Sequence, residues 1–177
     1  MIFRPKFKIQ NSKLRIDPPG PLLRNKPTVG ARYPGGRNMA TTVTVKVYFE
    51  AAHRLHNPQR SDEWNREVFG KCNNPHGHGH NYVIEASVAG EVDADSGYLI
   101  DMKDLKAVLN SMVVNDVDHR HLNIEVPWLE DINPTAENLA RVFFERVAPA
   151  LPEGIALTAL RVQETDRNSA TYTGPNS

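Results

Sequence analysis

Three histidines alternate with two glycines in the segment His76-Gly77-His78-Gly79-His80. Residues two apart in an extended chain point to the same face, so His78 and His80 can direct both imidazoles at one point, which the glycines leave uncrowded. His53 ends an earlier strand-like run and can supply a third nitrogen. Three imidazoles suit Zn²⁺ and leave one coordination position open, so the pattern predicts a catalytic zinc site rather than a closed structural one.

The histidines are clustered along the chain, since all seven lie between residues 53 and 121. An isolated histidine is usually an ordinary core or surface group, whereas a cluster of this density favours metal binding. The role of His76 stays open at this point, because it can replace His53 in the ligand set or face solvent.

Cys72 is the only cysteine, so it has no disulfide partner within the chain, and we expect a reducing, cytoplasmic compartment. It precedes His78 by six residues, across a turn-forming Asn-Asn-Pro segment. A lone cysteine is often an inert buried group. Here the neighbouring Lys71 and a nearby metal ion favour the thiolate, which predicts a role in proton transfer.

A second polar group occupies residues 116–121 and contains the pair Asp118 and His119. A carboxylate next to an imidazole is the arrangement that orients a general base. The pair alone does not identify a reaction.

Two strands are expected to carry the histidines. Apolar and polar residues alternate from Val43 to Phe49, which predicts a half-buried strand from Thr42 to about His53. Residues 81–89 predict a second strand. The polar, irregular residues 54–72 connect the two, so we expect a long-looped hairpin.

Two helices and two further strands complete the pattern. Asp101 is placed to cap a helix whose apolar residues repeat at helical spacing from Leu105 to Met112. A second helix begins at residues 133–135 and ends near Pro149. The order strand, strand, helix, helix, strand, strand favours an α+β fold, with an antiparallel four-stranded sheet and both helices on one face. The last two strands are expected at residues 157–164 and 171–173.

Length and charge narrow the class of protein. A chain of 177 residues suits one domain, and the absence of a run of about eighteen apolar residues predicts no membrane partner. Residues 1–38 hold nine basic residues and one acid, which leaves the rest net acidic by eight charges and argues against nucleic-acid binding. These residues are also rich in proline, so we expect a disordered or leader extension at 1–38 and one domain at 39–177, with Met39 as its functional beginning.

At these residues the chain resembles the 6-pyruvoyl-tetrahydropterin synthases and their bacterial relatives, the 6-carboxytetrahydropterin synthases. The resemblance runs from about Val45 to Tyr172 and leaves residues 1–38 outside. As a set, the motifs that carry it are highly specific: Phe49-Glu50-Ala51-Ala52-His53-Arg54-Leu55, Val68-Phe69-Gly70-Lys71-Cys72-Asn73-Asn74-Pro75, Gly77-His78-Gly79-His80-Asn81-Tyr82, Asp118-His119, Thr135-Ala136-Glu137-Asn138 and Glu164-Thr165-Asp166.

The resemblance implies a T-fold subunit whose sheet joins others into a barrel, in a homohexamer of two trimers with active sites between subunits. It places the zinc ligands at His53, His78 and His80 and the catalytic cysteine at Cys72. It implies that a triad is completed across a subunit boundary by Asp118 and His119. The pterin ring is expected to be anchored by Glu164, with Thr135 near the same ring.

The implied reaction is that of a lyase in tetrahydrobiopterin biosynthesis. It converts 7,8-dihydroneopterin triphosphate to 6-pyruvoyl-tetrahydropterin with loss of triphosphate, a carbon–oxygen cleavage, and it reduces the ring at the expense of the side chain without an external redox cofactor. The alternative within the family is a carbon–carbon lyase that releases acetaldehyde and forms 6-carboxytetrahydropterin for queuosine and other deazaguanines. Residues 72–80 look more like the pyruvoyl branch, but the sequence does not separate the two products.

Two departures and two other classes stay open. His76 stands where the family often has asparagine, and Glu50 where it often has a small residue, so metal geometry or selectivity can differ. A non-catalytic, zinc-stabilised binding module would be supported by a fourth protein ligand. A zinc hydrolase would need a carboxylate base, for which Glu50 is available.

Overall fold

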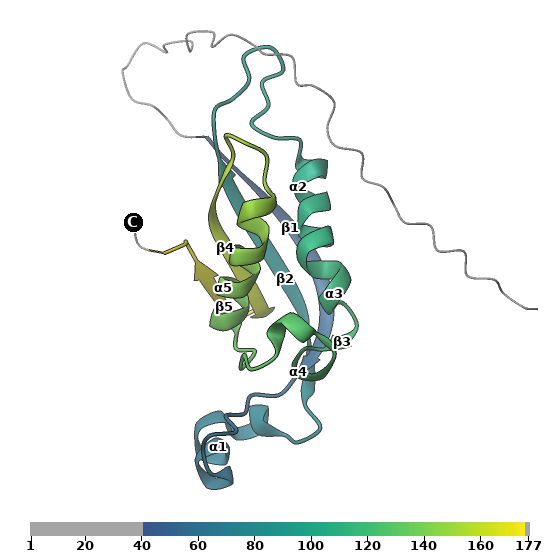
Figure 1. The fold of residues 1–177 in the computed structure, drawn as a ribbon, viewed down its shortest axis with the longest axis vertical. Coiled ribbons are helices and arrows are strands. Elements are labelled where there is room, and N and C mark those ends of the chain that lie inside the picture. Colours follow the sequence, from purple (N-terminus) through teal and green to yellow (C-terminus); the bar gives the residue numbers. More distant parts are fainter. Residues whose placement is uncertain (1–40, 176–177) are drawn as a thin grey trace, which may run out of the picture. The chain divides into compact units, whose positions relative to one another are not determined.

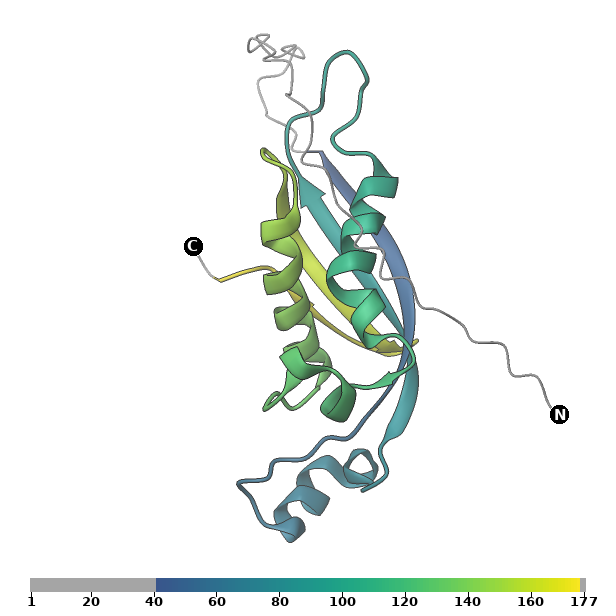
Figure 2. The ribbon, with the colours of Figure 1, turned by 45° about the vertical axis from the view of Figure 1, so that its right-hand side comes forward.

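The computed structural model describes residues 41–175, so the predictions made for residues 1–38 lie outside the described part of the chain. A five-stranded sheet in the order β3-β1-β2-β4-β5 forms the centre of this part. Figure 1 shows helices α2 and α5 lying across the sheet, and the turned view in Figure 2 shows both on the same side of it. The α+β class and the placement of two helices on one face are as predicted.

The two strands expected to carry the histidines pair along their whole lengths. β1 (Thr42–His53) runs antiparallel to β2 (His78–Ala89), with Thr42 opposite Ala89 at one end and His53 opposite His78 at the other. The long-looped hairpin is therefore confirmed, although β2 begins earlier than the sequence pattern indicated. The sheet continues through β4 (Ala156–Thr165), antiparallel to β2, and β5 (Asn168–Tyr172), antiparallel to β4.

The four predicted strands are present and antiparallel, but the sheet has a fifth strand, which pairs with the outer edge of β1. β3 (Arg120–His121) runs parallel to β1, opposite Ala51 and Ala52. Two residues are too few to show an alternation of apolar and polar positions, so only the backbone pairing identifies this strand.

The first predicted helix is interrupted by a wider turn. α2 (Met102–Leu109) begins at Asp101, whose carboxylate accepts a 2.8 Å hydrogen bond from the backbone N–H of Lys103, as an N-cap should. The π-helical turn η2 (Asn110–Val114) and the short α3 (Asn115–Val117) continue it. The chain then leaves the helix at Asp118, so this irregular helix delivers the predicted Asp-His pair to the sheet edge.

The second predicted helix is α5 (Ala136–Val147), followed by the 3₁₀ turn η4 (Ala148–Ala150). Its N-cap is Thr135, whose Oγ1 accepts a hydrogen bond of 3.3 Å from the backbone N–H of Asn138. Thr135 therefore has a local structural role in addition to its predicted place near the substrate.

One helix lies where the sequence analysis expected irregular chain. α1 (Asp62–Phe69) begins after the N-cap Ser61 and passes into the 3₁₀ turn η1 (Gly70–Asn73). Its buried residue is the polar Asn65, so the apolar periodicity that marks a helix is missing. Two further short helices, α4 (Leu122–Glu125) and η3 (Pro127–Leu129), connect β3 to α5.

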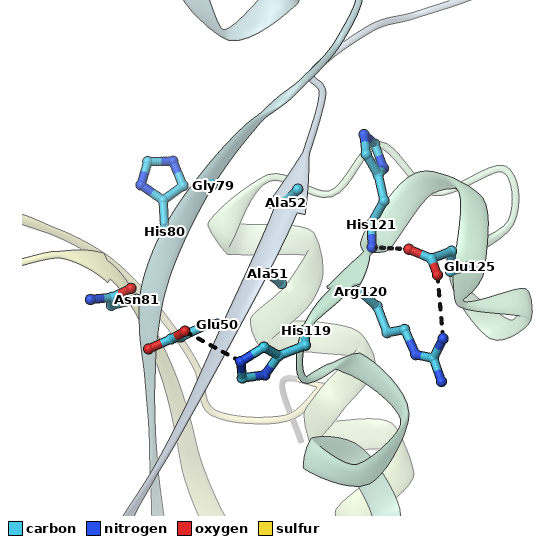
Figure 3. Close-up of a pocket in the computed structure, with 10 residues that line it drawn as sticks. All are labelled: Glu50, Ala51, Ala52, Gly79, His80, Asn81, His119, Arg120, His121 and Glu125. Atoms are coloured by element: carbon cyan, nitrogen blue, oxygen red, sulfur yellow. Dashed lines mark hydrogen bonds and ion pairs between the residues drawn. The ribbon is translucent and has the colours of Figure 1, made fainter.

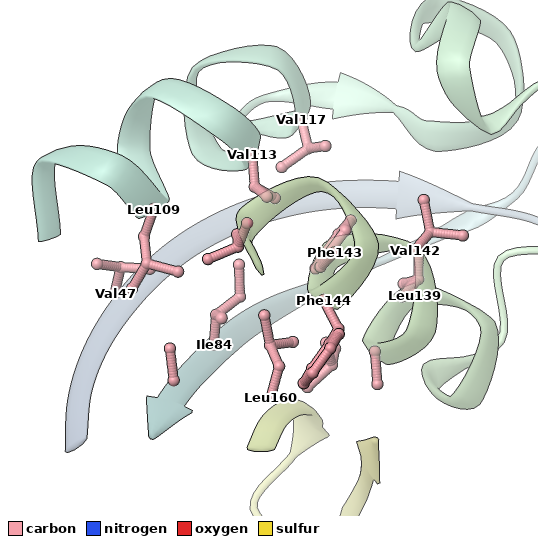
Figure 4. Packing of buried hydrophobic residues seen from close by; sticks show 14 of the residues in the cluster. Val47, Ile84, Leu109, Val113, Val117, Leu139, Val142, Phe143, Phe144 and Leu160 are labelled. Atoms are coloured by element: carbon pink, nitrogen blue, oxygen red, sulfur yellow. The ribbon is translucent and has the colours of Figure 1, made fainter. Parts of the chain in front are cut away.

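The core fills the space between the helices and one face of the sheet. Alternate residues of β1, β2 and β4 are buried there against α2, α3 and α5 (Figure 4). Phe143 of α5 packs edge-on against Phe49 of β1 and Trp128, with ring centroids about 6 Å from each. Residues 41–175 contain no helix with the length and apolarity needed to cross a bilayer.

Candidate metal centre and the cavities beside it

The pairing of β1 with β2 brings His53, His78 and His80 together. His53 lies opposite His78, and His80 lies opposite the buried Ala51. Residues opposite one another in an antiparallel pair share a face, and this is the face that the helices cover. All three imidazoles therefore lie on the core side of the sheet, at the end where β1 stops and β2 starts.

The three rings present a compact set of nitrogen donors. One ring nitrogen from each residue lies within 4.8 Å of the others, and the Nε2 atoms of His53 and His78 are 3.1 Å apart. Among residues 41–175 this is the set of His, Cys, Asp and Glu side chains close enough to share a metal ion. His76 is exposed and does not belong to it.

Hydrogen bonding and burial prepare His53 to act as a ligand. Its Nδ1–H donates to the backbone carbonyl of Pro134 at 2.9 Å, which leaves the lone pair of Nε2 pointing into the cluster. The side chain has no exposed surface. Burial, assisted by the neighbouring His78 and His80, lowers the pKa of His53 from 6.5 to about 4. The ring is thus neutral at physiological pH, which is the form that binds metal.

The other two predicted ligands, His78 and His80, also have ring nitrogens in surroundings that suit a metal ion. Burial, followed by the proximity of His80, lowers the pKa of His78. The Nδ1 of His78 and the Nε2 of His80 are buried and have no hydrogen-bond partner among the described residues. Buried polar atoms are normally paired. A bound metal ion would satisfy the His80 nitrogen, so the donor set fits the zinc ion that the sequence predicted.

Glu164 and Thr135, predicted to hold the pterin, line one cavity of about 560 Å³. Glu164 lies near the end of β4, and its Oε1 is 3.3 Å from Nε2 of His53 and 3.6 Å from Nε2 of His80. Arg167, in the turn after β4, also lines the cavity. The cavity therefore borders the histidine cluster, with a carboxylate acceptor between them.

Cys72 is held near the cluster by its backbone, and it lines neither of the two cavities described here. Its carbonyl accepts a 2.9 Å hydrogen bond from the N–H of Leu55, two residues after His53. The buried Asn73 adds a 2.7 Å bond from its side-chain amide to the carbonyl of Leu55. These bonds fix the turn that carries Cys72 to the end of β1, and its side chain is half-buried.

Asp118 and His119 lie at a different place from the histidine cluster. His119 borders a second cavity, of about 400 Å³, with Glu50 of β1 (Figure 3), and Asp118 lies beside it, with Oδ2 3.0 Å from Nδ1 of His119. Glu50 lies opposite Asn81 and is exposed, whereas its neighbours Phe49 and Ala51 are buried under the helices. Since successive side chains of a strand alternate between faces, Glu50 faces away from His53, His78 and His80. Within one chain, His119 therefore adjoins the face of the sheet opposite to the side chains of His53 and His78, although His80 also borders this cavity.

Two residues that the sequence analysis did not assign support the site. Gly77 has a φ of 73°, and a Cβ there would lie 2.8 Å from Nε2 of His121 and 2.9 Å from the carbonyl oxygen of His53. His121 borders the second cavity, and its buried Nδ1 has no partner among residues 41–175. The only signal for His121 in the sequence is its membership of the histidine group, whereas the glycines had been expected to leave the space between the imidazoles uncrowded.

The family profile described as "6-pyruvoyl tetrahydropterin synthase" matches residues 42–175, which is nearly all of the described chain. The chain belongs to the 6-pyruvoyl tetrahydropterin synthase family. Among curated family members, the 6-pyruvoyl tetrahydrobiopterin synthase of Poecilia reticulata is 43% identical over 132 residues, which cover 75% of this chain and 89% of the relative. The human enzyme of the same name is 39% identical over 140 residues, covering 79% and 96%.

The fold agrees with that of a solved member of the 6-pyruvoyl tetrahydropterin synthase family. The structure of the Caenorhabditis elegans 6-pyruvoyl tetrahydropterin synthase aligns with a TM-score of 0.73 at 40% identity, covering 77% of this chain and 96% of that one. The resemblance found in the sequence motifs is therefore confirmed for the family and for its T-fold architecture.

The packing around Gly77 predicts that Gly77→Ala weakens metal binding. The added Cβ would collide with the side chain of His121 and with the backbone of His53. His53 is a predicted metal ligand, so its displacement would disturb the metal site. Gly97→Ala is a matched control, because Gly97 has nearly the same φ, 74°, yet no described atom lies within 4 Å of its Cβ position. Both variants should lose about 1–2 kcal/mol of stability from the left-handed backbone. Metal analysis should show a deficit in Gly77→Ala alone, and equal metal content in the two would refute this role.

Proposed function

We propose that this chain is a zinc-dependent lyase that converts 7,8-dihydroneopterin triphosphate to 6-pyruvoyl-tetrahydropterin with loss of triphosphate. The observation that carries the proposal is the cluster of three imidazoles, in which His53 is buried and neutral, beside a cavity that contains a carboxylate acceptor. The names of the curated relatives support the same reaction.

His53, His78 and His80 would hold the zinc ion. When bound, zinc supplies Lewis acidity that makes carbon-bound protons of the coordinated substrate side chain more acidic. Glu164 would accept hydrogen bonds from the amino and imino groups of the pterin ring. Its Oε1 lies 3.3 Å from Nε2 of His53, so a ring held there has its side chain close to the metal ligands, and orientation of this kind is a large part of catalysis.

The protons would be moved by Cys72, Asp118 and His119. Cys72, on the turn tied to Leu55, would remove protons from the substrate side chain as a thiolate. Asp118 Oδ2 lies 3.0 Å from Nδ1 of His119, which orients the ring. His119 would return or relay the protons through Nε2.

The positions of these groups favour a site shared between subunits. His119 lies beside the exposed Glu50, on the face of the sheet opposite to His53 and His78, so we infer that one chain does not bring it to its own metal ion, although His80 also borders the cavity of His119. A neighbouring subunit would supply the pair, as expected for the homohexamer. The hexamer, like the cytoplasmic location, stays a prediction.

Two competing interpretations have less support. A structural zinc site would have a fourth protein ligand, and among residues 41–175 no fourth His, Cys, Asp or Glu joins the compact donor set. A hydrolase would need its base beside the metal. Glu50 faces away from the cluster, and the carboxylate that does lie beside it, Glu164, is assigned to the pterin ring.

The direct test of the proposed function is product analysis with 7,8-dihydroneopterin triphosphate and zinc-loaded protein. We expect 6-pyruvoyl-tetrahydropterin and one triphosphate per turnover. Release of acetaldehyde with 6-carboxytetrahydropterin would establish the alternative reaction instead, and no consumption of substrate would reject both.

Cys72→Ala should retain metal and fold but lose most turnover. General acid–base catalysis contributes about 10²- to 10⁴-fold, so kcat should fall in that range with little change in substrate affinity. Zinc content, melting temperature and turnover measured on this one variant distinguish the outcomes. Loss of metal would show that Cys72 is a zinc ligand. Retained turnover would contradict its role in proton transfer.

A shared site predicts complementation between inactive variants. Cys72→Ala and His119→Ala subunits, dissociated, mixed in equal amounts and reassembled, should regain about a quarter of wild-type turnover, because random assembly restores about one site in four. Each variant treated alone is the control and should stay inactive. If the mixture also stays inactive, the Cys72 and His119 of one active site come from the same chain.

A further inference from the structure

Glu50 has no role in the proposed reaction, yet its side chain is directed at His119, which has one. It lies on β1, on the face of the sheet away from the metal ligands. Its Oε2 is 3.6 Å from Nε2 of His119, and Figure 3 shows the two side chains pointing toward one another across the cavity. Nε2 is the atom through which His119 would exchange protons with the substrate.

The backbone fixes this approach independently of the glutamate side chain. The N–H of Glu50 donates to Oδ1 of Asp118 at 2.9 Å, and the N–H of His119 donates to the carbonyl of Glu50 at 2.6 Å. His119 has a φ of 59°, a left-handed conformation uncommon for residues other than glycine. Replacing the carboxylate should therefore leave the geometry of the Asp-His pair in place.

Two carboxylates consequently bracket one imidazole. The hydrogen bond from the N–H of Glu50, followed by the proximity of His119, holds the pKa of Asp118 below its usual value, so Asp118 accepts the proton of Nδ1. A neutral imidazole has a single N–H and would then present a lone pair to Glu50, whereas an imidazolium can donate to both carboxylates. The carboxylate of Glu50 is thus placed 3.6 Å from Nε2, on the side of the ring opposite to Asp118.

The remaining charged groups of the cavity are already engaged with one another. Arg120 of β3 lies 3.3 Å from Oε1 of Glu125 on α4, and the backbone N–H of His121 donates to Oε2 of Glu125 at 2.7 Å. From β2, Asn81 and His80 border the cavity. Among the residues that line the cavity, Glu50 is thus the carboxylate left to face Nε2 of His119.

We propose that Glu50 is a positioning residue that orients the ring of His119 and keeps its Nε2 protonated, so that the Asp-His pair acts as the proton donor of the reaction. This inference rests on the proposed function. In the step concerned, the Nε2–H bond breaks and the proton passes to the substrate, while its electron pair stays on nitrogen. The neutral ring, facing Glu50, then takes up a proton from Cys72 or from water.

The test compares Glu50→Gln, which removes the charge and keeps the shape, with Glu125→Gln, which removes a charge from the same cavity but not from His119. The Glu50 pair is exposed, so we expect kcat to fall by about twofold to fivefold in Glu50→Gln, with KM and metal content unchanged. Glu125→Gln should change kcat by less than about twofold. In a His119→Ala background, Glu50→Gln should have almost no further effect, because its action passes through that ring.

Nitrogen NMR of histidine-labelled protein gives a readout that does not depend on turnover. At neutral pH the Nε2 signal of His119, assigned from a His119→Asn variant, should move toward the unprotonated form in Glu50→Gln. An unchanged signal would overturn the proposal, as would an equal loss of kcat in the presence and absence of His119. If wild-type protein fails to turn over the pterin, the proposed function falls, while the NMR comparison still decides whether Glu50 controls His119.

Discussion

The register between β1 and β2 is the constraint on which the site depends. Side chains alternate along a strand, so a slip of one residue would move His78 and His80 to the opposite face from His53. Apolar packing next to the cluster prevents the slip. Phe49 and Tyr82 lie opposite one another, with ring centroids 4.7 Å apart and planes inclined by 7°, under the helices. The geometry of the metal ligands is thus a product of core packing.

The helix layer contributes to the same site through the backbone. The carbonyl of Pro134, which accepts the Nδ1–H of His53, directly precedes the N-cap of α5. The start of that helix also lines the cavity that contains Glu164. One short segment therefore sets the tautomer of a ligand, begins a helix and shapes the substrate cavity. A change at the N-terminus of α5 would therefore affect the tautomer of His53, the helix itself and the shape of the cavity.

Prediction from sequence succeeded where residues repeat with the period of a regular element. Alternating apolar residues located β1, and the spacing of His78 and His80 is that of one strand face. α1 escaped prediction because Asn65, its buried residue, bonds the carbonyls of Asn57, Arg60 and Ser61 instead of filling an apolar core. β3 has too few residues for a period. The face on which His119 lies depends on a left-handed turn, which spacing along the chain does not reveal.

The π-helical turn η2 sets the position of the Asp118-His119 pair separately from that of the metal ligands on β1 and β2. The two groups can therefore change independently during evolution. Such a turn contains one residue more than an α-helical turn, and each helical residue turns the chain by about 100° around the helix axis. Val113 and Val117 are buried within and just after it, and the chain then leaves the helix toward Asp118 and His119. Gain or loss of one residue here would re-aim the Asp-His pair while leaving the strands of the metal ligands untouched. The positions of the metal ligands depend on the register between β1 and β2, whereas the direction of the proton-transfer pair depends on the number of residues in the helix before it.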